Sequence, residues 1–346
     1  MLFIIFADRF FRTLNKAAGT SFTETLAKQF NHTEWFGSTF YDIIMPLFLF
    51  VVGAVIPFSL SKRMQENASK STLYLKLLKR FVLLFILGWI VQGNLLKFDS
   101  EQFRIFSNTL QAIAVGYFFS CISYIHLTKK WRYFVFVSCL ISYALLLSVT
   151  NVPGLGQSEL LPDQNLALYI DRFVFGKFDD GTQYTWLLSG FGFTATTLSG
   201  IFAGELIKSK HPRKKVAMYL MIYGIIGLSI GLIWGIWHPI VKKIWTSSFV
   251  LASSGICYLL LAFFYWVIDV KGKIKWAFPL KVIGSNAITA YVLSHVFNFP
   301  KIANYLLFGL EKYLGAYYEV INTIGGFGLL YLLLWYMHKN NTFIKI

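Results

Sequence analysis

The sequence predicts an all-α membrane protein, a polytopic bundle of about ten transmembrane helices. Of its 346 residues 56% are hydrophobic and only 14% are charged, against about 25% charged in a typical soluble domain. The 35 Phe, 19 Tyr and 10 Trp side chains exceed what one globular core of this length can bury, because its surface also needs polar cover. We therefore expect the lipid bilayer to surround most of the chain.

The individual helices follow from the apolar runs, since a transmembrane helix needs about 20 apolar residues. Nine segments meet this length in full or nearly so: 41–60, 81–96, 109–127, 133–152, 186–207, 216–238, 247–268, 279–297 and 318–338. The run Met1–Phe6 is expected to be the outer end of a tenth helix whose beginning is truncated. The longest polar connections, 7–40, 153–185 and 298–317, are too short for a soluble domain. Residues 1–346 are thus predicted to form a single transmembrane domain.

The orientation follows from the basic residues, because loops rich in Lys and Arg stay in the cytoplasm. Twenty of the 32 lie in one alternating set of segments: 61–80, 128–132, 208–215, 270–281 and the tail 339–346. The other twelve lie in 7–40, 97–108, 153–185, 240–246 and 298–317. We assign the first set to the cytoplasm, which places the C-terminus inside. The expected location is the bacterial inner membrane, where the chain is an integral multi-pass protein.

The formal net charge of +16 does not indicate a nucleic-acid partner. Nucleic-acid binding needs basic residues gathered on one face, whereas these form short clusters between apolar runs. Cys121, Cys139 and Cys257 lie inside apolar runs and form no CxxC pair, so we interpret them as packing thiols. HExxH and comparable ligand spacings are absent from the sequence. The sequence therefore predicts neither a metal site nor nucleic-acid binding.

The residues best suited to chemistry stand just before the apolar run Ile43–Leu60. The imidazole of His32 is a side chain that can act as a base or a nucleophile. Asp42, ten residues later, can orient the imidazole and stabilise its charged form. A carboxylate at a helix start can also serve only as an N-terminal cap, and a single loop histidine can be merely solvated. Trp35 and Gly37 between them complete a compact group at the predicted outer surface.

Two further histidines, His238 and His295, fall near the outer ends of their predicted helices and are expected to join the same site. The other three, His126, His211 and His338, lie at cytoplasmic ends, where solvated side chains are the simplest interpretation. Asn286 places a polar group within the predicted helix 279–297. Polar residues there often serve helix packing, so lining the site and packing both remain open for Asn286.

Several segments together resemble the motifs of one family, the heparan-alpha-glucosaminide N-acetyltransferases, which are transmembrane acyltransferases. The sequence is similar to the compact prokaryotic members over nearly its whole length. The block from His32 through Trp35, Gly37 and Asp42 to Gly53 matches H-x-x-W-x-G-x-x-x-x-D-L-x-F-P. The other matching segments are Arg104 to Gln111, Asn165 to Phe175, Leu198 to Gly204, Trp245-Thr246-Ser247-Ser248, and Gly284 to Ala287 followed by Tyr291 to Ser294.

The resemblance implies an enzyme that uses acetyl-CoA, held from the cytoplasmic side, as co-substrate and needs no metal. The acetyl group passes to an amino sugar of the glucosamine type at the opposite face. His32 occupies the position of the family's active-site histidine and Asp42 that of its associated acid. We expect Trp35, Gly37, Asn286, His238 and His295 to contact the sugar, and Arg104, Gln111, Trp245, Ser247 and Ser248 to contact the cofactor. Coenzyme A, the acceptor sugar and membrane lipid are the expected partners, and a homodimer is an open option.

The sequence departs from the family pattern in three places. The L-D-x-x-R-G motif of the first helix is absent. In the segment that resembles R-x-P-x-x-L-Q-R, Ala112 replaces the second arginine and Phe106 replaces the proline. Residues 7–31 hold no glycine-rich stretch of the kind that precedes the histidine in the animal enzymes, so the choice of acceptor is expected to differ. The clusters Lys208–Lys215 and Lys271–Lys281 either meet the phosphates of coenzyme A or serve topology alone. A transporter for a sugar or organic anion remains an alternative, as does an acyltransferase that modifies lipid or polysaccharide hydroxyl groups.

Overall fold

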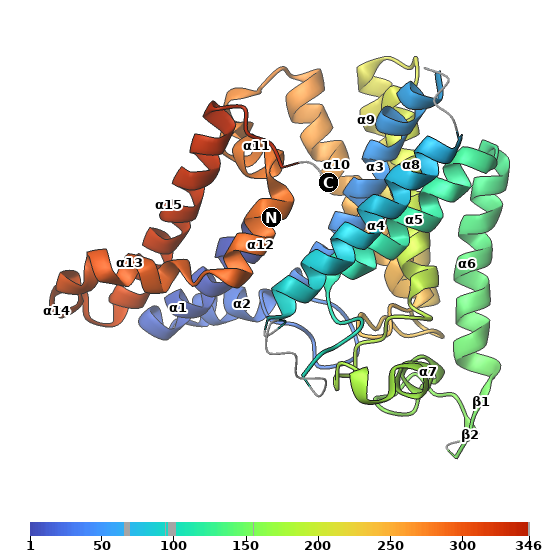
Figure 1. Cartoon of the computed structure of the whole chain (residues 1–346), viewed down its shortest axis with the longest axis horizontal. Coiled ribbons are helices and arrows are strands. Elements are labelled where there is room, and N and C mark those ends of the chain that lie inside the picture. The colour runs from blue at the N-terminus through green and yellow to red at the C-terminus, as the bar shows by residue number, and fades with distance from the viewer. Residues whose placement is uncertain (66–69, 94, 96–101, 155, 345–346) are drawn as a thin grey trace. The chain divides into compact units, whose positions relative to one another are not determined.

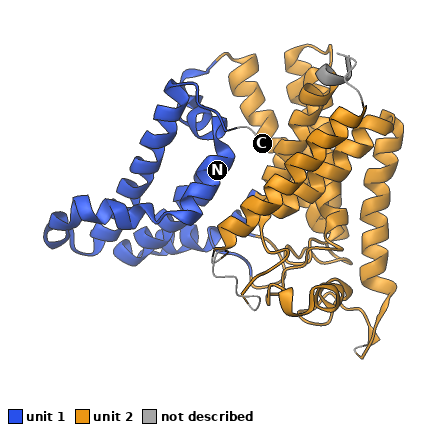
Figure 2. Cartoon of the chain, in the orientation of Figure 1, with its two compact units in different colours: residues 1–33, 39–44, 273–346 blue, residues 34–38, 45–272 orange. Residues whose placement is uncertain are grey.

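The predicted fold class is confirmed, because the computed structural model of the chain consists almost entirely of helices (Figure 1). It describes residues 1–346 apart from 66–69, 94, 96–101, 155 and 345–346, so the predicted loop 97–108 and the tail 339–346 fall partly outside the description. The chain forms two compact units (Figure 2). Unit 1 comprises residues 1–33, 39–44 and 273–346, and unit 2 comprises residues 34–38 and 45–272. The organisation as one domain over 1–346 stays a prediction.

Unit 2 contains long apolar helices that coincide with seven of the predicted spans. They are α3 (Ile44–Gln65, whose first residue belongs to unit 1), α4 (Lys70–Gln92), α5 (Thr109–His126), α6 (Lys129–Val149), α8 (Gly190–Lys208), α9 (Arg213–Trp234) and α10 (Ser247–Tyr265, extended by a π-helical turn to Val270). Shorter elements lie between α6 and α8: the antiparallel strands β1 (Asn151–Val152) and β2 (Gly156–Gln157), and α7 (Leu166–Phe175). The apolar runs thus predict the ends of these helices to within about five residues, except that α4 begins at Lys70, eleven residues before the predicted start at residue 81.

Five segments among the described residues are long and apolar enough to cross a membrane. They are Tyr41–Ser61, Lys129–Val149, Arg213–Trp234, Ser247–Val270 and Phe299–Lys339. Many large apolar side chains on these helices are exposed, for example Ile233 and Leu145, as expected where lipid replaces water. The chain is therefore a membrane helix bundle, while the number of about ten transmembrane helices stays a prediction.

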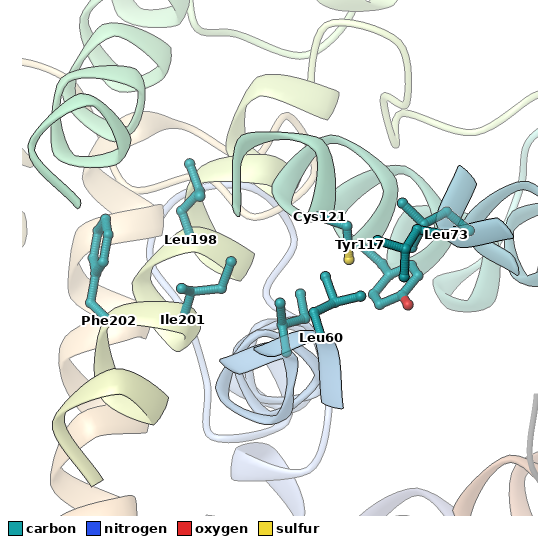
Figure 3. Close-up of a cluster of buried hydrophobic side chains, with 9 residues drawn as sticks. Leu60, Leu73, Tyr117, Cys121, Leu198, Ile201 and Phe202 are labelled. Carbon is teal, nitrogen blue, oxygen red and sulfur yellow. The ribbon is translucent and has the colours of Figure 1, made fainter. Parts of the chain in front are cut away.

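The interior of unit 2 is a close-packed cluster contributed by α3, α4, α5 and α8 (Figure 3). Leu60, Leu77, Cys121 and Leu198 are each at most 2% exposed within it. Cys121 and Cys257 are buried free thiols, in keeping with the packing interpretation, and Cys139 is partly buried. Helices α3 and α8 approach so closely that a Cβ added at Gly200 would lie 2.0 Å from the Phe50 carbonyl oxygen.

We expect Gly200→Ala to destabilise the protein by about 1–3 kcal/mol, since the added methyl group forces two backbones apart. Thermal unfolding in detergent measures this effect. Gly328→Ala on α15 is the matched control, because an added Cβ there meets nothing within 4 Å. Equal melting temperatures for the two variants would contradict the close approach of α3 and α8.

Four segments that the sequence assigns to the outer side meet at one end of unit 2, near α7 in Figure 1. The contacts are Gly37 N–H to Ile240 O (2.8 Å), Trp35 Nε1–H to Leu160 O (2.8 Å), Ile105 N–H to Phe178 O (3.2 Å) and Thr185 N–H to Lys243 O (3.0 Å). Because these four segments belong to the same predicted set of loops, their meeting agrees with the prediction that successive loops alternate between the two ends of the helices. Which end faces the cytoplasm stays a prediction.

Unit 1 combines the start and the end of the chain. Its helices are the π-helical turn Phe3–Ala7, α1 (Asp8–Ala18), α2 (Ser21–Gln29), α11 (Phe278–Ser285), α12 (Ala287–Val296), α13 (Phe299–Leu307), α14 (Glu311–Leu314) and α15 (Tyr318–Lys339), with 3₁₀ turns at Tyr41–Ile43, Lys275–Ala277, Phe308–Leu310 and Gly315–Tyr317. Their apolar side chains pack around Leu330, Leu334 and Ile283.

Three predicted features of unit 1 differ from the structure. The polar connection 298–317 is largely helical, since it contains α13 and α14. The connection 7–40 is not a loop throughout, because it contains α1 and α2. The sequence analysis did not predict α1 because this helix is strongly amphipathic, and its charged face gives the segment the composition of a polar connection. The predicted helix 279–297 is broken at Asn286, which has a non-helical backbone (φ −128°, ψ 43°). The Asn286 side chain donates to Thr342 O (3.1 Å) and accepts from Ile344 N–H (3.1 Å), so it joins the C-terminal segment to the break.

Candidate active site

The structure places His32 and Asp42 in direct contact within unit 1. The Nδ1 atom of His32 lies 2.6 Å from the Oδ1 atom of Asp42, which is the distance of a strong charge-assisted hydrogen bond. The Asp42 side chain is fully buried, whereas 42% of the His32 side chain is exposed. The pair therefore consists of an anchored carboxylate and an imidazole that faces outward from it.

The second oxygen of Asp42 is surrounded by donors from two threonines. Oδ2 accepts from the backbone N–H groups of Thr33 (3.3 Å) and Thr39 (3.0 Å), and the two threonine hydroxyl groups lie 3.0 and 3.1 Å away. The Thr39 hydroxyl also lies 2.7 Å from Asn31 O, so its single proton serves one of the two acceptors. An ionised carboxylate, which only accepts hydrogen bonds, fits this environment.

Aromatic packing holds the segment that carries His32. Phe30 at the end of α2 stacks on Phe11 of α1 at 4.5 Å and meets Phe40 at 5.7 Å, and Phe3 meets Phe40 edge-on at 5.0 Å. The Phe40 N–H also donates to Gln29 Oε1 (3.2 Å). The chain thus leaves α2 and returns to the start of α3 over a short distance, which brings residues 32 and 42 together.

Sequence analysis missed two residues beside this pair, Asp8 and Tyr41. The Tyr41 ring packs on the His32 ring at 4.8 Å, and its hydroxyl group interacts electrostatically with the Asp8 carboxylate. Asp8 forms an ion pair with Arg12 at 2.6 Å. Burial raises the pKa of Asp8, with the Arg12 guanidinium opposing the rise. The sequence signal that could have identified Asp8 is its position as an acidic residue at the end of the N-terminal apolar run.

A cavity of about 410 Å³ opens next to these side chains, within unit 1. Asp8, Arg12 and Tyr41 line it together with His295, one of the predicted site histidines. The His295 ring packs on Tyr291 at 4.3 Å, and its Nδ1 lies 2.8 Å from Tyr291 O. The structure therefore brings His295 to a cavity that also borders Tyr41, on which His32 packs.

His238 lies in unit 2 as a buried side chain that packs against Trp234. Its Nε2 has no hydrogen-bond partner among the described residues. Burial lowers the pKa of His238 to about 4, so the imidazole is neutral at pH 7. A role in substrate binding stays a prediction.

We expect acidification from about pH 6.5 to pH 4 to lower the free energy of unfolding through His238. In this range the unfolded chain takes up a proton at residue 238 that the folded chain does not bind. His238→Gln should make the pH dependence of thermal unfolding less steep on this side. His211→Gln, which alters an exposed histidine, is the control. A His238→Gln profile that follows the wild type throughout would show that His238 is not buried in its neutral form.

Trp35 and Gly37 have clear structural roles in unit 2. The Trp35 side chain is 7% exposed and packs among Tyr143, Val241 and Ile244. Gly37 has a φ of +88°, which favours glycine. Contact of either residue with a sugar stays a prediction.

Arg104 and Gln111 brace the segment that precedes α5. An Arg104 guanidinium nitrogen donates to Lys177 O (3.0 Å). The Gln111 side chain is fully buried; it accepts from Ser107 N–H (2.8 Å) and donates to Ile105 O (2.9 Å). Because these bonds occupy both ends of the amide, the structure explains Gln111 without a ligand, and cofactor contact stays a prediction for both residues.

The segment Trp245 to Ser248 is buried at the start of α10. Trp245 has a φ of +51° and packs beneath Gly192, where an added Cβ would lie 2.4 Å from the Trp245 ring. The Ser247 hydroxyl donates to Leu140 O (2.7 Å) and the Ser248 hydroxyl to Pro239 O (3.1 Å). These bonds fasten α10 to its neighbours. Cofactor binding by Trp245, Ser247 and Ser248 stays a prediction.

Comparison with known proteins places these residues in a wider context. Residues 23–92 match a family model described as a domain of unknown function (DUF5009), and this range includes His32 and Asp42. The chain is 26% identical over 333 residues to a heparan-alpha-glucosaminide N-acetyltransferase from Homo sapiens, with 78% of this chain and 49% of that protein covered. The chain is homologous to the heparan-alpha-glucosaminide N-acetyltransferases. The resemblance predicted from the sequence motifs is thereby confirmed.

A second heparan-alpha-glucosaminide N-acetyltransferase, from Mus musculus, is also 26% identical, over 326 residues. That alignment covers 76% of this chain and 48% of the mouse protein. The chain thus spans about half the length of the curated relatives it matches.

Proposed function

We propose that the protein is a membrane acyltransferase that moves an acetyl group from acetyl-CoA to the amino group of a glucosamine-type sugar. In this proposal acetyl-CoA is held from the cytoplasmic side and the sugar is acetylated at the opposite face. The observation that carries the proposal is the contact between His32 and Asp42, in which a buried, fully hydrogen-bonded carboxylate holds a partly exposed imidazole. The homologous N-acetyltransferases support the class of reaction.

The arrangement suits general base catalysis by His32. With the Nδ1 proton directed at Asp42, the neutral ring keeps its lone pair on Nε2. Nε2 takes a proton from the neutral amine as the new C–N bond forms at the thioester carbonyl. The C–S bond then breaks, and the sulfur of coenzyme A leaves with that proton. Asp42 stabilises the imidazolium that exists between these steps.

The same geometry also permits His32 to carry the acetyl group itself, with Nε2 as the nucleophile. The two routes differ in one measurable respect. Incubation with labelled acetyl-CoA in the absence of any acceptor leaves label on the wild-type protein that is missing from His32→Ala only if His32 is acetylated.

The basic end of unit 2 is the proposed entry side for coenzyme A. Lys208 there binds the Pro57 carbonyl oxygen and the Ser61 hydroxyl group, and Arg213 donates to Asp269 O (3.1 Å). These cations lie at the opposite end of the helices from the segments around α7. This agrees with a donor and an acceptor that approach from opposite sides of a multi-pass protein in a bacterial inner membrane with a cytoplasmic C-terminus.

The decisive experiment incubates the purified full chain in detergent with radiolabelled acetyl-CoA and a panel of amino sugars. We expect label in glucosamine-type sugars and none in glucose. Transfer to glucose at an equal rate would favour an acyltransferase acting on hydroxyl groups. Transfer to no acceptor by protein that unfolds cooperatively would contradict the acetyltransferase function.

One observation favours the alternative of a transporter for a sugar or organic anion. The apolar segment 278–296 is broken at Asn286, and transporters bind substrates at interrupted helices. In this chain, however, the Asn286 carboxamide bonds to Thr342 and Ile344. The break is thus occupied by the chain's own C-terminal segment, so we place the transporter second.

A further inference from the structure

A groove of about 460 Å³ lies between α9 and α10 in unit 2, and the proposed reaction does not use it. The buried side chains of Ala217 and Ala262 are small and leave room at its floor. The exposed side chains of Met218, Met221 and Phe263 form its sides. Both helices belong to segments that are long and apolar enough to cross a membrane. The groove therefore lies on a surface that faces lipid, where an acyl chain is the apolar group available to fill it.

One end of the groove carries cations. Lys214, in the first turn of α9, is the charged residue among its described lining residues. Trp266, the first residue of the π-helical turn after α10, lines the same end, and the Nζ atom of Lys271 lies 5.0 Å from the centroid of the Trp266 ring. The Arg213 guanidinium donates to Asp269 O (3.1 Å), which ties the start of α9 to that turn. The groove is thus apolar along its length and cationic at one end.

Positive charge predominates where these two helix ends meet. The segments 209–216 and 266–272 contain five Lys or Arg residues and one acid, Asp269. Basic pockets between membrane helices bind the anionic headgroups of lipids. Basic residues at helix ends also set membrane topology, but topology requires neither a lysine in the wall of an apolar groove nor a second one held over an aromatic ring beside it.

Another apolar cavity in unit 2 shows what distinguishes the groove. It has a volume of about 510 Å³, and residues of α5, α6 and α8 contribute to its lining. All of its described lining residues are uncharged. An acyl chain there would gain apolar contact alone, so this cavity has no means of selecting a headgroup. Only a site that joins an apolar groove to cations favours one class of phospholipid over another.

We propose that the groove between α9 and α10 is a binding site for an anionic phospholipid. One acyl chain lies along Met218, Met221 and Phe263, and the phosphate lies beside Lys214 and Lys271. The flexible thioether side chains of the two methionines suit an irregular apolar ligand. The inference goes beyond the proposed function and does not depend on it, because lipid binding requires no acetyl transfer.

The test uses the purified full chain in detergent and a photoreactive phosphatidylglycerol that carries a diazirine in its acyl chain. After irradiation, we expect mass spectrometry to find the label on peptides that contain residues 217–221 and 259–266. A phosphatidylcholine probe with the same acyl chains should label them about fivefold less, because its headgroup has no net charge. Lys214→Gln should weaken the apparent affinity for the phosphatidylglycerol probe about fivefold. Lys130→Gln, which removes an exposed cation from the first turn of α6, is the matched control and should keep the affinity.

A second variant tests the groove itself. Met221→Trp fills the groove and should remove the label from residues 259–266, whereas Leu145→Trp, at a similarly exposed position on α6, should not. Both variants should unfold at the wild-type temperature, since both side chains are exposed.

Three outcomes would overturn the proposal. Equal labelling by the two lipids, or an affinity that Lys214→Gln leaves unchanged, would make the groove an ordinary contact with bulk lipid. Labelling confined to other peptides would place the lipid elsewhere. Loss of the label on addition of coenzyme A would assign these cations to the cofactor. None of these results depends on whether the protein transfers acetyl groups, so the proposed function is tested separately.

Discussion

His32→Ala is expected to abolish acetyl transfer, with kcat reduced by about 10²–10⁴-fold if His32 acts as a base. The loss arises because Nε2 of His32 is the proposed acceptor of the amine proton. The binding of acetyl-CoA should be largely retained. Initial rates with labelled acetyl-CoA and a saturating amino sugar measure the effect, and equilibrium binding of the co-substrate checks that the variant is folded.

The control is His211→Ala, which removes an exposed histidine beyond the end of α8. It should leave the rate unchanged. If His32→Ala retained more than about a tenth of the wild-type kcat, His32 would be neither the base nor the acetyl carrier.

Asp42→Asn is expected to lower kcat by about 10³–10⁴-fold with a small change in KM, as in other histidine–aspartate pairs. The donors of Thr33 and Thr39 surround Oδ2, so the amide oxygen of an asparagine would face them. Its NH₂ group would then point at His32 Nδ1. This forces the tautomer with the proton on Nε2, which removes the lone pair that the reaction requires.

Glu34→Gln is the matched control for Asp42→Asn, because Glu34 is an exposed acid from the same stretch of sequence. It should have no effect on the rate. Thermal unfolding separates a tautomer effect from misfolding: the variant should unfold cooperatively at the wild-type temperature while its kcat stays reduced. A variant that kept the wild-type kcat would assign Asp42 to structural support alone.

The site was only partly predictable from the sequence. His32 and Asp42 are ten residues apart in one motif, so a short excursion between two helices suffices to join them. Asp8 and Tyr41 were missed because their contact depends on α1, which the sequence analysis treated as part of a polar connection. Cofactor contact of Trp245, Ser247 and Ser248 stays a prediction from their motif, and the structure adds that the hydroxyl groups of Ser247 and Ser248 bond to Leu140 and Pro239. A motif identifies which residues occur together but not which contacts they make.

The sequence by itself determined the membrane helix class, the approximate ends of the long helices and the pairing of His32 with Asp42. Each of these depends on hydropathy or on spacing over a few residues, and both can be read along one dimension. Only the tertiary structure decided that Asn286 interrupts a predicted helix, that Asp8 and His295 line one cavity beside Tyr41, and that an apolar groove between α9 and α10 has a cation at one end. These features arise from contacts between segments that lie far apart in the chain, such as α1 (Asp8–Ala18) with α15 (Tyr318–Lys339). The packing of side chains sets such contacts, and no local pattern encodes them.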